Sequence, residues 1–207
     1  VLEELSWDPE VEATEVGVEV DDGVVTLTGW VDSYAKKLAA ERAAQRVEGV
    51  RAVADDLSVR TAGTWTDTDI AKAAANVLEA NSVVPRGRIE VTVKNGKISL
   101  TGDVDWEYQR MAAANSVRHL AGVREVINLI IIKQPKVSET AVKGGIERAL
   151  VRAAEVDAAR IQVHSEDGHV RLTGTVRSWP EKQATTEAAW KAKGVTRVTN
   201  DIEVRPM

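Results

Sequence analysis

The chain has 207 residues, of which 43% are hydrophobic and 29% are charged, and its formal net charge is −5. This composition is typical of a folded globular protein, and no apolar run approaches the roughly 18 residues of a membrane-spanning helix. The absence of cysteine excludes disulfides, thiol catalysis and thiolate metal sites, and three histidines leave little material for a histidine-rich metal site or a catalytic triad.

Charge is distributed unevenly along the chain. Residues 1–63 contain 6 Lys and Arg against 14 Asp and Glu, residues 64–134 contain 9 against 8, and residues 135–207 contain 12 against 10. No third of the chain has the concentrated basic stripe that a nucleic-acid surface needs, so we expect no nucleic-acid partner. The acidic first third disfavours anionic partners and is compatible with cation binding.

Glycines divide the sequence into three similar repeats. They recur at spacings of 73 and then 72 residues in three sets: Gly23, Gly96 and Gly168; Gly29, Gly102 and Gly174; Gly49, Gly122 and Gly194. The text around them is also similar, with DDGVVTLTGWV, KNGKISLTGDV and EDGHVRLTGTV in the three copies. This period is longer than a solenoid repeat and has the size of a small domain. We therefore predict three tandem domains: domain 1 at residues 1–63, domain 2 at 64–134 and domain 3 at 135–207.

A helix is predicted at the start of each repeat. Apolar residues share one helical face at Ile70, Ala74, Val77 and Leu78 in domain 2, and at Val142, Ile146, Ala149, Leu150 and Ala153 in domain 3. In domain 1 only the end of this helix is expected, because Val1-Leu2-Glu3 matches Val77-Leu78-Glu79. The first helix of domain 1 is therefore predicted to be truncated.

A β-hairpin is predicted next. Apolar residues alternate at Val16, Val18 and Val20, at Ile89, Val91 and Val93, and at Ile161 and Val163, with Ser165 in the last slot of domain 3. The dipeptides Asp22-Gly23, Asn95-Gly96 and Asp167-Gly168 favour two-residue turns, since both central positions need positive φ. Such a turn pairs Val20 with Val25 and Val18 with Leu27, so the apolar residues reach one face of the sheet.

A second helix and a last strand complete each repeat. The second helix is predicted to begin at the N-caps Ser33 or Asp32, Asp105 and Ser178. It is predicted to end at the C′ residues Gly49, Gly122 and Gly194. The positions predicted to face the core are Ala35, Leu38, Ala39 and Val47 in domain 1 and Met111, Ala112 and Leu120 in domain 2. The last strands are expected over 53–59, 126–132 and 198–204. The sequence thus predicts an α+β fold of three α-β-β-α-β domains, each with two helices on one face of a three-stranded mixed sheet.

The pattern of an Asp-Gly or Asn-Gly turn, LTG-x-V, a helix, GV-x-x-V and a final strand resembles the BON domain. Its carriers are Gly23, Leu27, Gly29, Val31, Gly49, Val50 and Val53; Gly96, Leu100, Gly102, Val104, Gly122, Val123 and Val126; and Gly168, Leu172, Gly174, Val176, Gly194, Val195 and Val198. The resemblance covers essentially the whole chain. It implies a non-catalytic module of bacterial stress or envelope proteins, described as phospholipid-associated and with one potassium-binding member. The shared motif is structural, so the resemblance carries over no functional residues.

The sequence offers no candidate catalytic, cofactor-binding or metal site. His164 and His169 flank Glu166 and Asp167, but the turn register places His164 opposite Arg171, where a neighbouring cation opposes metal binding. The glycines of LTG-x-V are read as strand ends, and no serine has a nucleophile-elbow context. We therefore predict a protein that is not an enzyme and that holds no cofactor.

Two features predict an interaction surface. If Ile130 and Ile132 face the core in the last strand of domain 2, Leu129 and Ile131 point to the other face of the sheet. The equivalent positions in domains 1 and 3 are polar: Asp56, Ser58, Asp201 and Glu203. Tryptophans gather near the start of the second helix, at Trp30, Trp106 and Trp179. We expect Leu129, Ile131 and these tryptophans to contact another domain, a second chain or a ligand.

Two functions follow as hypotheses. The first is a stress- or envelope-related binding protein that contacts a phospholipid surface or a protein partner. The alternative is a potassium-type small-cation sensor, suggested by Asp21, Asp22, Asp55 and Asp56 in domain 1. Because no charged n-region and apolar h-region is visible, we expect a cytoplasmic protein, or a periplasmic one if a leader precedes Val1.

Overall fold

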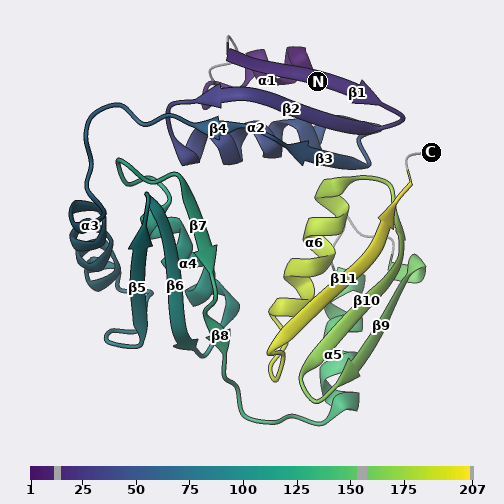
Figure 1. Ribbon diagram of the computed structural model, residues 1–207. Helices are drawn as coiled ribbons and strands as arrows, with labels where there is room; N and C mark the ends of the chain where they lie inside the picture. The colour runs from purple at the N-terminus through teal and green to yellow at the C-terminus, as the bar shows by residue number, and fades with distance from the viewer. Residues whose placement is uncertain (12–14, 153–157, 206–207) are drawn as a thin grey trace. The chain divides into compact units, whose positions relative to one another are not determined.

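The computed structural model describes residues 1–11, 15–152 and 158–205. Within these residues the chain forms six α-helices and three separate mixed β-sheets, in the order that Figure 1 shows. The predicted α+β class is confirmed, and so is the order of helix, hairpin, helix and last strand in each repeat. One predicted core residue, Ala153, lies outside the described residues.

Domain 1 contains the first sheet. Its elements are α1 (Leu2–Trp7), β1 (Val16–Asp21), β2 (Val24–Val31), α2 (Tyr34–Arg46), β3 (Ala52–Asp55) and β4 (Ser58–Val59). Strand β2 is central, with β1 antiparallel on one side and β3 parallel on the other, and β4 continues the β3 side. The connection from β2 through α2 to β3 therefore joins two parallel neighbours.

Domain 2 repeats this plan with a longer first helix. Its elements are α3 (Asp67–Ala80), β5 (Ile89–Lys94), β6 (Lys97–Val104), α4 (Glu107–Val117), β7 (Glu125–Asn128) and β8 (Ile131–Ile132). The sheet order is β5-β6-β7, and β8 pairs with the distal part of β6. Strand β7 therefore lies at the edge of its sheet.

Domain 3 has the longest last strand. Its elements are α5 (Glu139–Arg152), the 3₁₀ turn η2 (Ala158–Arg160), β9 (Ile161–Glu166), β10 (His169–Val176), α6 (Trp179–Trp190) and β11 (Arg197–Val204). Its core is one cluster of buried residues from both helices and the sheet: Val142, Ile146, Leu150, Ile161, Val163, Val170, Leu172, Val176, Ala188, Ala189, Val195 and Ile202. Both helices thus cover the same face of the sheet.

The hairpin register agrees with the sequence prediction. Val20 pairs with Val25, and Val93 pairs with Ile98. The turn residues Asn95 and Gly96 have φ of 53° and 76°, as a two-residue turn with both φ positive requires. Val20 shares the sheet face of its buried partner Val25, but its side chain is 57% exposed. It lies next to the turn, beyond the part of the sheet that the helices cover.

Alanines are prominent among the buried residues of α2 and α4. In α2 the buried residues are Ala39, Ala40, Ala43 and Ala44, and in α4 they are Ala113 and Val117. The predicted inner position of Met111 is wrong, since this side chain is exposed, and Ala112 is only half-buried. Small side chains let a helix approach the sheet closely. The buried face of such a helix is narrower than that of a helix that packs through large apolar residues.

These helices also end earlier than predicted. They stop at Arg46, Val117 and Trp190, three to five residues before the glycines expected at C′. Tight turns fill the gap; Leu120 N–H donates to the Val117 carbonyl, and Val123 N–H donates to the Leu120 carbonyl. Gly122 follows with φ of 82° and reverses the chain toward the last strand.

The last strand is interrupted in two domains. The ranges predicted as single strands divide into β3 and β4 in domain 1, and into β7 and β8 in domain 2. At the interruption the Asn128 side chain accepts the Ile130 N–H, and Asp55 likewise accepts the Leu57 N–H. In domain 3 the corresponding strand β11 is continuous.

The predicted alignment of the first helix is wrong by about one turn. Leu2, which was matched to Leu78, is 56% exposed, whereas Leu5 is fully buried. Leu5 precedes Gly23 by the same 18 residues that separate Leu78 from Gly96. Val11 and Val84 are buried at equivalent positions after the two helices, which supports the corrected alignment.

Candidate functional site

The outer sheet face of domain 2 carries an apolar stripe. Ile130 and Ile132 are buried, while Leu129 is 57% and Ile131 is 54% exposed, so the predicted alternation is confirmed. Ile127 adds a third side chain, 38% exposed, on the same face. We call Ile127, Leu129 and Ile131 the outer stripe. Ile127 was not among the predicted interface residues, although extending the alternation by two residues identifies it.

The equivalent positions in the other sheets are not apolar stripes. The repeat spacing aligns the outer stripe with Ala54, Asp56 and Ser58 in domain 1 and with Thr199, Asp201 and Glu203 in domain 3. Arg171 Nε lies 3.5 Å from Asp201 Oδ2 across the outer face of the domain 3 sheet. The outer stripe is therefore a property of one repeat and not of the fold.

Charged residues flank both ends of the outer stripe. Glu125 Oε2 lies 2.5 Å from Lys97 Nζ on the neighbouring strand, and both side chains are substantially exposed. Lys133 is exposed beyond the other end. An apolar centre with a charged rim is the usual composition of a protein interface.

The predicted tryptophans are only partly exposed. Trp30, Trp106 and Trp179 are half-buried. The Arg60 guanidinium lies 5.2 Å from the centre of the Trp30 ring, and Lys182 Nζ lies 5.1 Å from that of Trp179. Such cation–π contacts orient an indole within its own domain. A role for these tryptophans in an interface remains a prediction.

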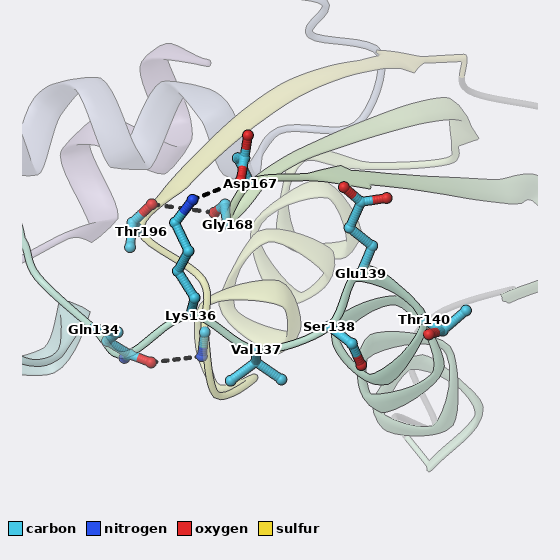
Figure 2. Close-up of a pocket in the computed structure, with 10 residues that line it drawn as sticks. Gln134, Lys136, Val137, Ser138, Glu139, Thr140, Asp167, Gly168 and Thr196 are labelled. Carbon is cyan, nitrogen blue, oxygen red and sulfur yellow. Dashed lines mark hydrogen bonds and ion pairs between the residues drawn. The ribbon is translucent and has the colours of Figure 1, made fainter.

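A polar pocket of about 430 Å³ lies in domain 3 (Figure 2). It is lined by Gln134, Lys136, Val137, Ser138, Glu139, Thr140, Asp167, Gly168, Gly194 and Thr196. These residues come from the segment before α5, the first turn of α5, the β9–β10 turn and the loop between α6 and β11. The sequence did not predict this pocket, because its walls come from segments about 30 residues apart.

Hydrogen bonds hold the walls of this pocket together. The Gly194 N–H donates to Gln134 Oε1 at 2.6 Å, and the Thr196 N–H donates to the Gly168 carbonyl at 2.8 Å. Lys136 Nζ lies 3.1 Å from Asp167 Oδ1 (Figure 2). The lining includes hydroxyls and carboxylates but neither histidine nor cysteine. The arrangement offers polar contacts for a small group and no recognisable nucleophile–base pair.

The same place in domain 2 is occupied by a carboxylate. Asp67, the first residue of α3, accepts the N–H groups of Asn95 and Gly96 at 2.8 and 2.9 Å. These bonds, that of Gly96 first, lower the pKa of Asp67 below its usual 3.8. The domain 3 counterpart is Glu139, and within the described part of the chain its carboxylate makes no such bond to the β9–β10 turn.

Neither histidine of domain 3 belongs to a metal cluster. His164 pairs with Arg171 and His169 with Glu166, as the register predicted, and His169 Nε2 lies 2.7 Å from Thr199 Oγ1. Across the described residues, no group of three or more His, Cys, Asp or Glu side chains is arranged to hold a metal ion. In domain 1, Asp55 is paired with Lys37 at 3.3 Å. Cation sensing by domain 1 stays a prediction.

Within residues 1–11, 15–152 and 158–205, no helix combines the length and the apolar character needed to cross a bilayer.

Comparison with known proteins gives matches along the whole chain. The family model for the BON domain matches residues 1–61, 66–134 and 138–206. Osmotically-inducible protein Y of Escherichia coli strain K12 is 34% identical over 124 residues, which are 57% of this chain and 62% of that protein. The 21 kDa hemolysin of Actinobacillus pleuropneumoniae is 29% identical over 154 residues, 69% of this chain and 77% of that protein. The chain thus matches less than two thirds of the length of osmotically-inducible protein Y.

Among solved structures, CdsD, a structural protein of the type III secretion system of Chlamydia trachomatis, is 18% identical with a TM-score of 0.30, over 94% of this chain and 87% of that one. The family model carries the assignment, because it matches three consecutive segments that each contain the turn, strand and helix pattern described above. The chain belongs to the BON domain family and contains three copies of the domain.

Proposed function

We propose that this chain is a non-catalytic binding protein of bacterial stress or envelope physiology, and that it docks a protein partner on the outer stripe of domain 2. The family and the relatives named for osmotic induction and hemolysis support the physiological setting. The outer stripe carries the proposal, because it is the feature that distinguishes domain 2 from its two sister sheets.

Exposed aliphatic side chains on a regular sheet face need an explanation. Removing a large aliphatic side chain from water stabilises a complex by roughly 1.5–3 kcal/mol when its burial is complete. Ile127, Leu129 and Ile131 already lose part of their exposure in the fold, so their combined contribution is smaller than three full burials. It is still large enough to favour docking over an exposed apolar row, which promotes aggregation.

Charge favours a protein partner over a phospholipid surface. Binding to anionic lipid normally relies on clustered Lys and Arg. Domain 2 carries 9 basic against 8 acidic residues, and the ends of the outer stripe carry Glu125, which is paired with Lys97, and Lys133, so no cluster of basic side chains surrounds it. A rim of mixed charge around an apolar centre fits a protein surface of mixed charge.

Site-specific photo-crosslinking tests the proposal. A photoreactive residue in place of Ile127, in bacteria exposed to osmotic upshift, should give a discrete protein adduct. Leu129→Ser with Ile131→Ser should reduce that adduct at least tenfold. The control pair Val20→Ser with Val24→Ser, which removes two exposed aliphatic residues from the sheet of domain 1, should leave it unchanged.

Vesicle flotation tests the alternative that the outer stripe binds lipid. Purified chain is mixed with vesicles of phosphatidylethanolamine and phosphatidylglycerol and centrifuged through a density gradient. Flotation of the wild type that the Leu129 and Ile131 substitutions abolish would show that the outer stripe binds lipid instead of protein. No flotation together with no adduct would remove the proposed role of the outer stripe.

A further inference from the structure

We infer that the partner docked on the outer stripe is a second copy of this chain, arranged antiparallel about a two-fold axis at Leu129. The inference rests on the proposed function and names the occupant of its site. It depends on the order of the side chains along one sheet face, on their exposure, and on the charges at the two ends.

The outer face of domain 2 has a self-complementary order. Every second residue from 125 to 133 lies on this face, and the order is Glu125, Ile127, Leu129, Ile131 and Lys133. When two such rows run antiparallel about Leu129, each Ile127 meets Ile131, and each Glu125 meets Lys133. A two-fold interface uses the same patch on both copies, so this order satisfies both apolar and ionic pairing with one surface.

The sister sheets lack this property. The equivalent order is Ala52, Ala54, Asp56, Ser58 and Arg60 in domain 1, and Arg197, Thr199, Asp201, Glu203 and Arg205 in domain 3. The same antiparallel arrangement would place Asp56 against Asp56 in domain 1. In domain 3 it would place Asp201 against Asp201 and Arg197 against Arg205. Like charges directly opposite each other are unfavourable, so only domain 2 is suited to pair with itself.

The position of the outer stripe in its own sheet permits this approach. Strand β7 is the edge strand of domain 2, with β6 on one side and no strand of the described chain on the other. Both ends of the row are exposed, including Glu125 at 40% of its side-chain surface. The outer stripe lies on the sheet face opposite the buried Ile98 and Leu100, and its three side chains are exposed, so a second copy can reach it without displacing a strand of domain 2.

The size of the outer stripe predicts a weak dimer. A standard stable interface buries about 800 Å² on each partner, or 20–30 residues. Three partly exposed aliphatic residues and two charged residues supply only part of this area. We therefore expect a concentration-dependent equilibrium between monomer and dimer, with the pairing of Glu125 and Lys133 setting orientation more than affinity.

Charge exchange gives a sharp test with the full chain. Sedimentation velocity, run from about 1 µM to 1 mM to span weak association, should show a dimer of the wild type. Glu125→Lys and Lys133→Glu should each weaken dimerisation at least fivefold, because each variant opposes like charges at both ends. An equimolar mixture of these two variants should recover the dimer, since every pair across the axis then joins opposite charges.

Cysteine crosslinking checks the axis itself. The chain contains no cysteine, so Leu129→Cys introduces a single thiol. Two-fold symmetry places the two thiols opposite each other at the axis, and packed sheets lie roughly 10 Å apart, so a short bifunctional thiol crosslinker should yield covalent dimer. Asp201→Cys, at the equivalent position of domain 3, is the matched control and should crosslink at least tenfold more slowly.

The outcomes separate this inference from the proposed function. A monomeric wild type at every concentration, or single-charge variants that dimerise as the wild type does, would overturn the homodimer. A photo-adduct with a different protein would also overturn it while leaving the proposed function in place. Protection of Leu129 within a monomer would show that another domain of the same chain covers the outer stripe, which contradicts the inference.

Discussion

The glycine of the LTG motif is conserved between the three repeats for a reason that local sequence does not show. Gly29, Gly102 and Gly174 have φ of 105°, 121° and 126° and lie inside strands β2, β6 and β10, not at strand ends as predicted. A Cβ on Gly102 would lie 2.0 Å from the carbonyl oxygen of Arg88, the residue just before the paired strand β5. The position therefore excludes any side chain, both by backbone conformation and by space.

Gly102→Ala should accordingly destabilise domain 2. The unfavourable φ alone costs about 1–3 kcal/mol, and the contact with the Arg88 backbone adds to this cost because a carbonyl cannot move as a flexible side chain does. Thermal unfolding followed by calorimetry should show a lower transition for this domain. Gly145→Ala is the control; its Cβ meets no atom within 4 Å, and in helix α5 the change should stabilise by about 0.5–1 kcal/mol. Equal melting of Gly102→Ala and wild type would contradict the assignment.

The carboxylate of Asp67 predicts a difference between two otherwise similar turns. Asp67→Ala removes the acceptor of the Asn95 and Gly96 N–H groups, so these two amides should exchange hydrogen faster. Glu139→Ala in domain 3 should leave exchange at Asp167 and Gly168 unchanged. Because folding lowers the pKa of Asp67, its ionised carboxylate should protect the Asn95 and Gly96 amides from exchange fully above pH 3.8. This protection should be lost as the pH falls through the folded pKa. Identical responses of the two turns would contradict this account.

At the scale of elements, α1 shows how tertiary contacts support a helix that is too short to persist alone. It has six residues, whereas isolated helices below about 12–15 residues are marginal in water. Leu5 is buried, and Arg46 of α2 binds Glu4 and Asp8 at 3.2 and 2.7 Å. The hydrogen bond from Arg46 is the largest cause that lowers the pKa of Asp8 below 3.8. These contacts fasten α1 to α2.

This arrangement predicts a pH dependence for α1. Because folding lowers the pKa of Asp8, its ionised form stabilises the docked helix above pH 3.8, and this contribution disappears as the pH falls through the folded pKa. Carboxyl titration by NMR should show Asp8 titrating below 3.8, and Arg46→Gln should return it toward that value. Arg42→Gln, which removes the exposed pair with Glu10, is the control and should change the Asp8 midpoint much less. An Asp8 midpoint unaffected by Arg46→Gln would contradict the arrangement.

Elements were predictable from the sequence where two local signals coincide. Asn95-Gly96 fixes both the turn and the register of β5 and β6, and alternation then assigns Ile98 and Leu100 to the core, as the structure confirms. Element ends were less predictable. The end of α4 at Val117 depends on a series of tight turns before Gly122, and at the break between β7 and β8 the Ile130 N–H donates to the Asn128 side-chain oxygen. Hydrophobic periodicity encodes neither feature.

The candidate site also has one part that was predictable from the sequence and one part that was not. The exposure of Leu129 and Ile131 was predictable, because it depends only on alternation along one strand and on comparison with the sister repeats. The domain 3 pocket was not, because Gln134 and Gly194 meet only after the chain has folded back by 60 residues. Local patterns report which side of an element a residue occupies, whereas a pocket depends on the approach of distant segments.

At the scale of the whole molecule, the two segments between repeats are held differently. Residues 62–64 are exposed, Trp65 Nε1–H donates back to the Ala62 carbonyl, and Trp65 lies against Gly122 of domain 2. The second segment is fastened to domain 3: Gln134 accepts the Gly194 N–H, Lys136 pairs with Asp167, and Val137 packs against the domain 3 core. The first joint should therefore open more readily than the second.

Limited trypsin digestion should show this order. Cleavage is expected first after Arg60, next to the exposed joint, and later after Lys133 or Lys136, because proteases act on backbone that opens locally. Gln134→Ala removes one fastening of the second joint and should accelerate cleavage after Lys136, while cleavage after Arg60 keeps its wild-type rate. Mass spectrometry of the early fragments identifies the sites. Early cleavage after Lys94 or Lys97 would contradict the expected order, because both residues flank the β5–β6 turn, where Asp67 holds the backbone N–H groups of Asn95 and Gly96.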